Sequence, residues 1–560
     1  MNPGLKLGWV LLLTVGVCAN SLEAQSYPRY RAIGSTYVPL NSWVYPALER
    51  LAALHYIKSD FRGTRPWTRT ECARLTDEAG EAIQDALHQD DKVGAEVADL
   101  YQSLEREFRP ELHALAGGST RSLELESAYA RVTSLSGPIL NDSYHFGQTI
   151  ANDYGRPFRR GTNVVAGASL RATYGPFFAY GWAEFQHSPG APALSDGQRQ
   201  FIADVDGLPL KSAVPFNEIN QFRPLDSYVG INVKNWQLSF GRQSLWWGTS
   251  ESGPLLFSNN AEPINMVRLS RAVPFKLPSF LGVFGPMKID FFVGRLGGHE
   301  VAARPWLQGQ RISFKMAPWF EFGATHTAVF GGEGRPNGPD VFFRSLFGVG
   351  ERRARGVAAA PGEELSDQHL SFDFLFRFGR HVTYYGEFLG SDDPHPFNAP
   401  SRMAVNTGFY LPRMLGWSKL DLRLEGFYTD SPDTSHSSFK ASLHYWHHVY
   451  RSGYTNNGNI LGNSIGRAGV GFQAWTSYWF SPSERLQFSF RRNQVSDTFV
   501  PNGAQWNDFS VQHERELKAG FYLRSSVQVE RLKYPFLFSS PRTNVAAVLE
   551  LGFARETSRK

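Results

Sequence analysis

The sequence predicts an all-β fold with a small α addition: a closed antiparallel transmembrane β-barrel of about 16–18 strands, preceded by a short N-terminal helical bundle. Three observations predict it. Residues 1–24 have the features of a signal peptide, apolar residues recur at helical spacing over residues 38–116, and a period of two dominates residues 120–560. These ranges are the three predicted domains.

The composition suits a barrel better than a helical membrane protein. The chain has 560 residues, 42% of them apolar and 14% aromatic, yet its mean hydropathy is only -0.32. Its formal charge of +5 would suit nucleic acid, but 57 basic and 52 acidic side chains are interspersed along the chain. No nucleic-acid partner is therefore predicted.

The predicted signal peptide places the chain outside the cytoplasm. Lys6 precedes an apolar run over residues 7–19, and a cleavage position follows Ala24. The run is shorter than the roughly 20 residues that a membrane-spanning helix needs. Its removal would leave Cys72 as the single cysteine, so packing or hydrogen-bonded strands must stabilise the exported chain.

The predicted periplasmic bundle contains three helices. Asn41 or Ser42 is suited to cap the first helix. Thr68 and Glu71 have the spacing of a capping box at the start of the second helix. A third helix is expected to stop at Pro110, because proline interrupts helical hydrogen bonding. The apolar stripes are narrow, which implies that the bundle packs on another part of the chain.

The barrel prediction comes from alternation over residues 123–553. The clearest apolar positions are Leu370, Phe372, Phe374, Phe376 and Phe378, then Leu420, Leu422 and Leu424, then Leu486, Phe488 and Phe490, and finally Val545, Ala547, Leu549, Leu551 and Phe553. Many runs reach the roughly 9–11 residues that a tilted strand needs to cross a bilayer. Aromatic residues gather near their ends, as in membrane girdles. The apolar face is thus expected to contact lipid, in a closed barrel without open strand edges.

Three connections are long and rich in Gly, Pro and charge: residues 188–217, 331–368 and 391–400. Long loops of bacterial barrels face outward, whereas short turns face the periplasm. The middle loop contains Arg335, Arg344, Arg352, Arg353 and Arg355. Such charge is typical of a solvated loop, and the alternative is a basic mouth that attracts an acidic polymer.

Three short motifs give little support to catalysis or metal binding. Residues 462–466 fit a nucleophile elbow, but they are predicted in a loop instead of a strand-turn-helix corner. Residues 204–207 resemble part of a calcium loop without its closing Glu. His444 and His448 are predicted on one face of a strand and His447 on the other, without further ligands at suitable spacing. No catalytic residue, metal site or cofactor is predicted.

Residues 241–271 are least like an ordinary strand or loop. Trp246 and Trp247 precede a glycine-flanked polar turn, which leads to Asn259 and Asn260. An aromatic ring can cover the apolar face of a sugar while amides and guanidinium groups bind its hydroxyls. The structural alternative is that Trp lies at a membrane interface and that Asn and Gly form turns.

The same stretch resembles a known family. Its matching residues are Gly241-Arg242, Trp246-Trp247-Gly248, residues 255–261 and Pro263. These resemble the most distinctive segment of the Wzi family of capsule assembly proteins. Weaker supporting fragments follow in order at residues 39–45, 65–71, 331–336, 421–428, 450–455, Gly458 and 461–462.

The resemblance implies an outer-membrane barrel of about eighteen strands with a helical bundle at its periplasmic end. It also implies a non-enzymatic, lectin-like role in holding capsular or other exported polysaccharide at the cell surface. The sequence departs from the family pattern at the Arg-rich loop over residues 331–368 and at the polar tail over residues 554–560. The first departure bears on which polymer is recognised, and the second on how the assembly machinery recognises the end of the barrel. The opening helices are also similar to S-layer homology modules, which would imply contact with the cell wall.

The function predicted from residues and resemblance together is polysaccharide binding without turnover. The candidate binding residues are Arg242, Trp246, Trp247, Asn259, Asn260 and Arg335. Trp would stack on a sugar, Asn would bind hydroxyls, and Arg would pair with acidic groups. The expected partners are surface polysaccharide and outer-membrane lipid, and the expected state is a monomer in the bacterial outer membrane.

Two other functions remain open from the sequence. The first is a porin-like channel for small solutes or saccharides, with the helices and long loops as constrictions. The second is an outer-membrane hydrolase, which would need Ser464 to meet a His and an acid or amide in space. The candidate binding residues also have a structural alternative, in which they fill the barrel lumen or set a strand corner.

Overall fold

The computed structural model of the chain describes residues 33–89, 92–348, 365–391, 402–431 and 444–554. The predicted signal peptide lies outside these ranges. So do Arg352, Arg353 and Arg355, most of the predicted loop over residues 391–400, and the tail after Ala554.

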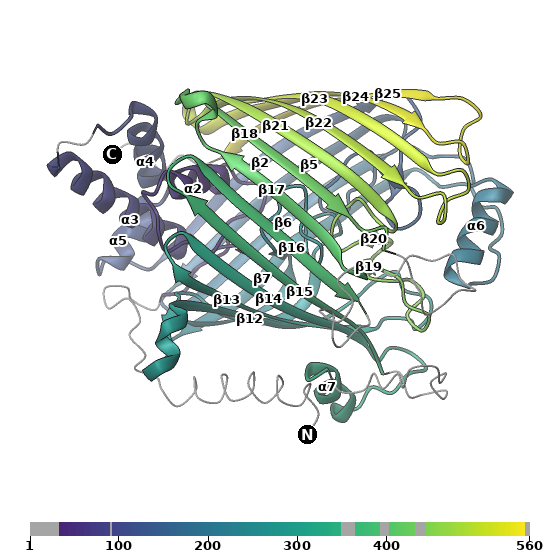
Figure 1. Cartoon of the computed structure of the whole chain (residues 1–560), viewed down its shortest axis with the longest axis horizontal. Helices are drawn as coiled ribbons and strands as arrows, with labels where there is room; N and C mark the ends of the chain where they lie inside the picture. Colours follow the sequence, from purple (N-terminus) through teal and green to yellow (C-terminus); the bar gives the residue numbers. More distant parts are fainter. Residues whose placement is uncertain (1–32, 90–91, 349–364, 392–401, 432–443, 555–560) are drawn as a thin grey trace.

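Within these ranges, eighteen strands form the barrel wall (Figure 1). In chain order they are β2 (Ser122–Leu135), β5 (Gly161–Tyr174), β6 (Phe177–Ser188), β7 (Ile219–Val233), β8 (Trp236–Gln243), β10 (Ile264–Arg271), β12 (Pro286–Arg295), β13 (Trp306–Ala317), β14 (Phe320–Phe330), β15 (Ser366–Phe378), β16 (Val382–Ser391), β17 (Ala404–Leu411), β18 (Leu420–Tyr428), β21 (Gly469–Ser481), β22 (Glu484–Val495), β23 (Ala504–Glu516), β24 (Phe521–Lys533) and β25 (Arg542–Ala554).

Antiparallel pairing closes these strands into one barrel. Each wall strand pairs with the next along the chain, and β25 returns to β2, with Ala554 opposite Ser127 and Ala546 opposite Leu135. Closure removes the free strand edges that lipid could not satisfy. The predicted closed antiparallel barrel of about 16–18 strands is confirmed.

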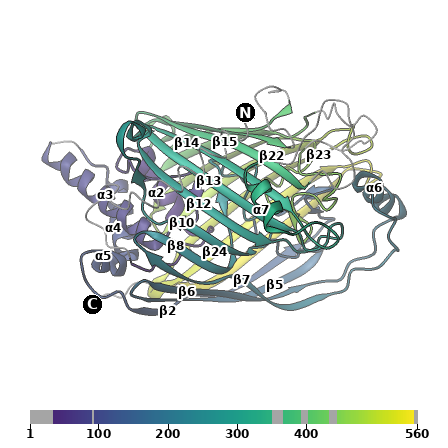
Figure 2. The ribbon, with the colours of Figure 1, turned by 90° about the horizontal axis from the view of Figure 1, so that it is seen from below.

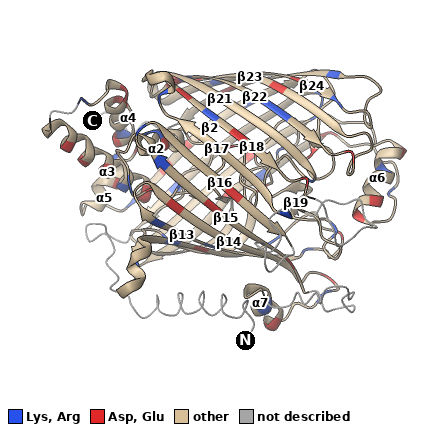
Figure 3. Cartoon of the chain, in the orientation of Figure 1, with Lys and Arg blue, Asp and Glu red and all other residues tan. Residues whose placement is uncertain are grey.

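The two faces of the wall differ as the alternation predicted. On β15, Phe378 is 58% exposed on the outside, whereas Asp373 and Arg377 are buried on the lumen side. On β25, Leu549 and Leu551 are likewise exposed on the outside. Acidic and basic residues are intermingled along the strands (Figure 3). Such an apolar outer surface is costly in water and matches the hydrocarbon of a bilayer.

The two ends of the barrel also differ. Four helices lie together at one end, α2 (Val44–Ala53), α3 (Arg69–His88), α4 (Ala95–Glu107) and α5 (Arg109–Leu115) (Figures 1 and 2). Short turns join most neighbouring strands at this end. The long loops gather at the other end, where α6 (Asp196–Asp206) lies. α7 (Pro339–Leu346) belongs to one of these loops and packs against the outside of the wall at β13 and β14.

The helix starts depart in detail from the sequence prediction. Trp43 occupies the cap position of α2, and Ser42 Oγ accepts a 3.3 Å hydrogen bond from the amide of Val44. Thr68 caps α3 as predicted, accepting from the amide of Glu71 at 3.0 Å. Pro110 lies in the first turn of α5, where its missing amide donor is tolerated, so helical structure continues past it.

Glu71 does not complete the predicted capping box by bonding back to Thr68. Its carboxylate instead accepts a 2.9 Å hydrogen bond from Lys288 on β12, which ties α3 to the barrel wall. Across the described ranges, none of the helices combines the length and apolar character needed to cross a bilayer.

The outward face gives a first testable prediction. Leu549 lies near the middle of β25 and points outward, so Leu549→Arg should destabilise the barrel by about 2–4 kcal/mol in a bilayer. Urea unfolding in lipid vesicles measures this. Leu549→Phe, which keeps the position apolar, serves as the matched control and should change stability little. Equal stability of the Arg variant and the control would contradict a lipid-facing surface.

Candidate functional site

The chain before the first wall strand enters the lumen at the helix-bearing end. The carbonyl of Ile33 accepts from Asn232 on β7 at 2.9 Å. The amide of Tyr37 donates to the hydroxyl of Tyr228 at 2.8 Å, and the guanidinium of Arg268 lies 4.4 Å from the Tyr37 ring centroid. Residues 33–67 therefore bind to the inner wall, and we call them the N-terminal plug.

Buried ion pairs hold the N-terminal plug in place. Glu49 on α2 lies 2.8 Å from Arg423 on β18 and 3.0 Å from Arg62. Asp60 lies 2.8 Å from Lys315 on β13 and 3.0 Å from Arg377 on β15. A buried charge is costly unless it is paired and hydrogen-bonded. The plug and the wall thus neutralise each other's charges.

Carboxylates of the wall also accept hydrogen bonds from plug amides. Glu321 on β14 accepts from the amides of Arg62 and Gly63, both at 3.0 Å. A Cβ at Gly63 would lie 2.7 Å from a carboxylate oxygen of Asp373. Only glycine lets the backbone approach the wall this closely. The lumen carboxylates therefore recognise the backbone of the plug as well as its cations.

A second segment, residues 244–263, fills the lumen between β8 and β10. We call it the central segment. Glu387 on β16 accepts from the amide of Leu255 at 3.0 Å. Glu425 on β18 accepts from the amides of Glu251 and Ser252, at 2.7 and 2.8 Å. The central segment and the N-terminal plug are thus held by the same type of contact.

The predicted Trp pair lies inside this central segment. Trp246 and Trp247 form the short strand β9 (Trp246–Trp247), which pairs with β1 (Thr64–Arg65) of the N-terminal plug. The side chain of Trp247 is 0% exposed. It packs edge-to-face on Phe257 and Phe292, with centroid distances of 5.2 and 5.4 Å. These rings join the central segment to the wall, while the pairing of β9 with β1 joins it to the N-terminal plug.

The two asparagines and the arginine of the prediction lie in or beside the same segment. The Asn260 amide donates to the carbonyl of Ile460 at 3.1 Å. Asn259 is buried, and its backbone carbonyl accepts from the amide of Tyr154 at 2.6 Å. Arg242, at the end of β8, donates to Glu262 at 2.6 Å.

The fold therefore brings five of the six candidate residues together, and four of them are buried. The five are Arg242, Trp246, Trp247, Asn259 and Asn260, and the four buried ones are the Trp and Asn residues. These residues contact other described parts of the same chain. Direct contact of these residues with a polysaccharide stays a prediction.

Arg335 lies apart from that group, in the loop between β14 and β15. It is half-buried, and its guanidinium lies 6.0 Å from the ring centroid of Tyr450. Asn337 shapes the same loop by accepting from the amide of Gly332 and donating to its carbonyl, both at 2.8 Å. Arg335 thus belongs to the loop-bearing end.

Polar contacts tie the long loops to one another across the barrel mouth. Lys211, after α6, pairs with Glu300 of the β12–β13 loop at 2.5 Å. In that same β12–β13 loop, Arg304 pairs with Glu333 of the next loop. On the other side, Arg467 lies 3.1 Å from Asp206 at the end of α6. Loops distant in sequence therefore form one connected outer surface.

His145 is a cation within this outer surface. Its Nδ1 lies 2.7 Å from Asp142 and its Nε2 lies 2.8 Å from Asp206. Burial lowers the pKa of His145, but the two carboxylates outweigh burial and raise it to about 9. The ring is therefore protonated at neutral pH and links the β2–β5 loop to α6.

Sequence reasoning missed the residues that build these contacts. Residues 204–207, which resemble part of a calcium loop in sequence, instead form the end of α6: Asp206 is its last residue, and Gly207 follows in the left-handed conformation with φ 65°. His444 and His447 were predicted on a strand, but they are buried in a loop. Among the described residues, no group of three or more Cys, His, Asp or Glu could hold a metal ion. The carboxylates and cations that pair in the lumen lie far apart in the sequence, so no local pattern predicts which of them pair.

The fold and its contents define a plugged membrane β-barrel. The sequence model of the family described as Capsule assembly protein Wzi matches residues 130–547, so the chain belongs to that family. The match covers most of the barrel and includes all of the central segment.

One relative and one solved structure add to this comparison. An uncharacterized 55.8 kDa protein in the cps region of Klebsiella pneumoniae is 26% identical over 181 residues. That match covers 31% of this chain and 34% of the relative, about a third of its length. The chain is also similar to the structure of Wzi, described as an outer membrane protein involved in group 1 capsule assembly in Escherichia coli and a carbohydrate binding β-barrel. The TM-score is 0.65 at 16% identity, covering 93% of this chain and 99% of that one, which supports the fold.

The ion pairs of the plug predict how stability depends on pH. Burial raises the pKa of Glu49, but Arg423 and Arg62 outweigh it and lower the pKa from 4.5 to about 2. A lowered carboxylate pKa stabilises the fold above the unfolded pKa, and this contribution is lost as pH falls through the folded value. Thermal unfolding in detergent should therefore change little from pH 7 to about 5 and shift downward from about pH 4.5 to 2.

Glu49→Gln tests the assignment of this effect. It should reduce the free energy of unfolding at pH 7 by about 3–5 kcal/mol, because Arg423 and Arg62 lose their buried partner. It should also reduce the fall in unfolding temperature between about pH 4.5 and 2. Asp85→Asn, which changes an exposed carboxylate on α3, is the matched control. If the unfolding temperature of the Glu49 variant fell between about pH 4.5 and 2 as it does in the wild type, the role given to the contacts of Glu49 with Arg423 and Arg62 would be contradicted.

Proposed function

We propose that the chain holds capsular or other exported polysaccharide at the cell surface, from a barrel in the bacterial outer membrane and without turnover. Membership of the capsule assembly family is the observation that carries this proposal. The similar Escherichia coli protein is described as a carbohydrate binding barrel, which is consistent with it. The short turns and helices face the periplasm, and the long loops face outward.

The filled lumen favours a binding platform over a porin-like channel. A diffusion channel needs a continuous aqueous path, whereas here the N-terminal plug and central segment cross the interior and pair through β1 and β9. Buried ion pairs and amide–carboxylate contacts hold both segments. Opening a path would leave several charges without partners.

The connected outer loops are the surface proposed to meet the polymer. Arg335 lies at this end and suits a uronate or another acidic group. Single contacts of this kind are weak, but they sum along a repeating polymer through effective concentration. Arg242, Trp246, Trp247, Asn259 and Asn260 are proposed to support the loops from below, given the burial of the Trp and Asn residues.

The protein is proposed to lie in outer-membrane lipid as a monomer. The exposed apolar band of the wall, with residues such as Phe378 and Leu551, suits outer-membrane lipid. The barrel closes within a single chain, which favours a monomer. Residues 38–116 are proposed as one domain, whose helices α3 to α5 face the periplasm and whose residues 38–67 belong to the N-terminal plug in the lumen. Residues 120–560 are proposed as the barrel domain.

Polysaccharide binding by the purified protein tests the platform. Arg335→Ala should weaken binding to the host's own surface polysaccharide by about fivefold, because a partly exposed charge contact is lost. Arg380→Ala removes an exposed arginine at the helix-bearing end and should leave binding unchanged. Surface plasmon resonance on immobilised polysaccharide measures both. Absence of binding by the wild-type protein would remove the proposed function.

The Trp246→Ala, Trp247→Ala double variant separates direct from supporting roles. If the two Trp residues only support the fold, the double variant should unfold at a lower temperature than the wild type. It should still bind polysaccharide well below that temperature. Loss of binding in a double variant that unfolds at the wild-type temperature would instead restore direct stacking on sugar.

Conductance across planar bilayers tests the channel alternative. Wild-type protein should show no steady open channels. Asp60→Asn should add brief openings, because Lys315 and Arg377 lose the partner that anchors the plug. Asp85→Asn again serves as the matched control. Steady wild-type conductance for small solutes would favour a porin-like channel.

A further inference from the structure

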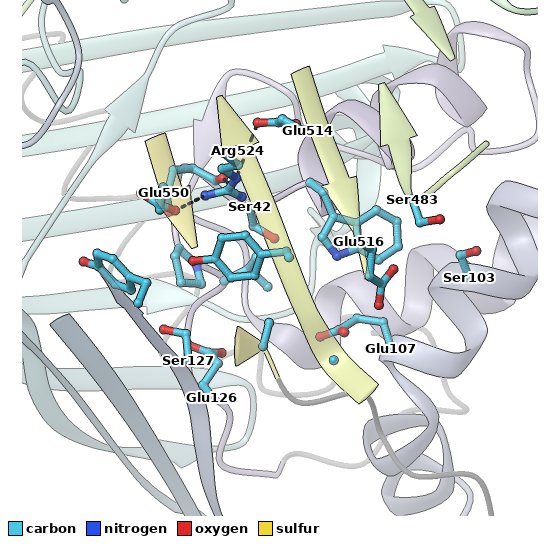
Figure 4. A pocket seen from close by; sticks show the side chains of 18 of the residues that line it. Ser42, Ser103, Glu107, Glu126, Ser127, Ser483, Glu514, Glu516, Arg524 and Glu550 are labelled. Carbon is cyan, nitrogen blue, oxygen red and sulfur yellow. Dashed lines mark hydrogen bonds and ion pairs between the residues drawn. The ribbon is translucent and has the colours of Figure 1, made fainter. Parts of the chain in front are cut away.

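A cavity of about 300 Å³ lies at the helix-bearing end, away from the outer loops (Figure 4). Residues 38–46, α4 and α5 border it on one side, and the lumen faces of β2, β5, β6 and β21 to β25 border it on the other. Its volume is at the lower end of the roughly 300–1,000 Å³ typical of small-ligand sites. The polysaccharide platform does not use this cavity.

Aromatic rings from the N-terminal plug and from several wall strands line the cavity. Trp43 and Trp479 border it beside the helices, Tyr522 borders it on β24, and Trp182 lies buried on β6. The guanidinium of Arg485 lies 5.3 Å from the Trp479 centroid. Flat rings among polar groups suit the mixed apolar and hydroxylated faces of a sugar.

Carboxylates and guanidinium groups occupy the wall between these rings. Arg524 lies between Glu514, at 3.5 Å, and Glu550, at 3.3 Å, as Figure 4 shows. Glu126 accepts from the hydroxyl of Tyr180 at 2.8 Å. Each ionised carboxylate has several acceptor positions, so these groups retain capacity for ligand hydroxyls while they bind one another.

The unfilled donor positions of one arginine in the lining favour an acidic ligand. Nine arginines and seven glutamates line the cavity, and most of these arginines pair with carboxylates. Arg131 Nη1 lies 3.1 Å from Asp153, and its Nε forms a longer ion pair of 3.7 Å with Glu550. Its buried Nε and Nη2 form no hydrogen bond within the described parts of the chain. Arginine presents its donors in a planar fork that matches a carboxylate. A ligand carboxylate would satisfy donors that the chain itself does not.

The cavity is accessible from the helix-bearing end. Arg106 and Arg109 of the helices and Arg515 and Glu516 of β23 border it and are exposed to solvent. Trp182 is buried deeper in the barrel. A ligand would thus enter from the side opposite to the outer loops.

We propose that this cavity binds an acidic mono- or disaccharide unit, with a sugar face on the aromatic rings and a carboxylate near Arg131. The periplasmic direction of entry rests on the proposed function, because that function sets the orientation of the barrel. The protein then carries two saccharide sites, one on each side of the membrane.

Isothermal titration of the purified full chain in detergent with digalacturonate tests this site, and galactobiose is the neutral counterpart. Wild-type protein should bind digalacturonate at least about tenfold more tightly, because a charge-assisted hydrogen bond is stronger than a neutral one. Arg131→Gln should remove that preference while galactobiose binding stays measurable.

Two helix variants test the place of binding. Ser103→Trp on α4 fills the cavity from its border and should weaken binding at least about tenfold. Gln102→Trp adds the same ring at the adjacent exposed position and should bind as the wild type does. Unfolding temperatures of both variants confirm that the barrel is intact.

The outcomes separate this inference from the proposed function. Failure of wild-type protein to bind digalacturonate, or equal binding by Ser103→Trp and Gln102→Trp, overturns the cavity site even when polysaccharide binding at the outer loops persists. Loss of surface-polysaccharide binding with retained digalacturonate binding instead overturns the proposed platform and leaves the cavity site standing.

Discussion

Charged side chains on the lumen face of the wall would be costly to bury alone, because desolvation in a low-dielectric interior exceeds what one isolated charge can recover. In this barrel they meet opposite charges on a part of the same chain that precedes the wall. Asp60 lies between Lys315 and Arg377, and Glu49 lies beside Arg423. The filled lumen, the position of the helices and the support beneath the loops all depend on this pairing.

The main features of the wall could be predicted because they follow from local periodicity. Alternation of residues such as Phe374 and Asp373 specifies which side chains face lipid and which face the lumen. The partners of the lumen charges could not be predicted in this way. Arg50 and Asp421 are 371 positions apart, and no local pattern relates them.

The contacts of the candidate binding residues could not be predicted from local sequence either. The unusual composition of residues 241–271 indicated a segment unlike an ordinary strand or loop, and the structure places most of it inside the lumen. The resemblance indicated the family. Composition alone does not distinguish a Trp that stacks on a ligand from one that packs on Phe257 and Phe292. Capping residues such as Thr68 were predictable, whereas the use of Glu71 by Lys288 required the wall to be in place.

The link between Arg50 and Asp421 has a consequence for biogenesis. Asp421 lies on β18, late in the wall, whereas Arg50 precedes the first wall strand. Closing so long a chain loop has a high entropic cost until the intervening strands are paired. The amino-terminal part of the chain therefore locks into its final position late, even though it is synthesised first. Its locking therefore requires the wall to have formed at least as far as β18.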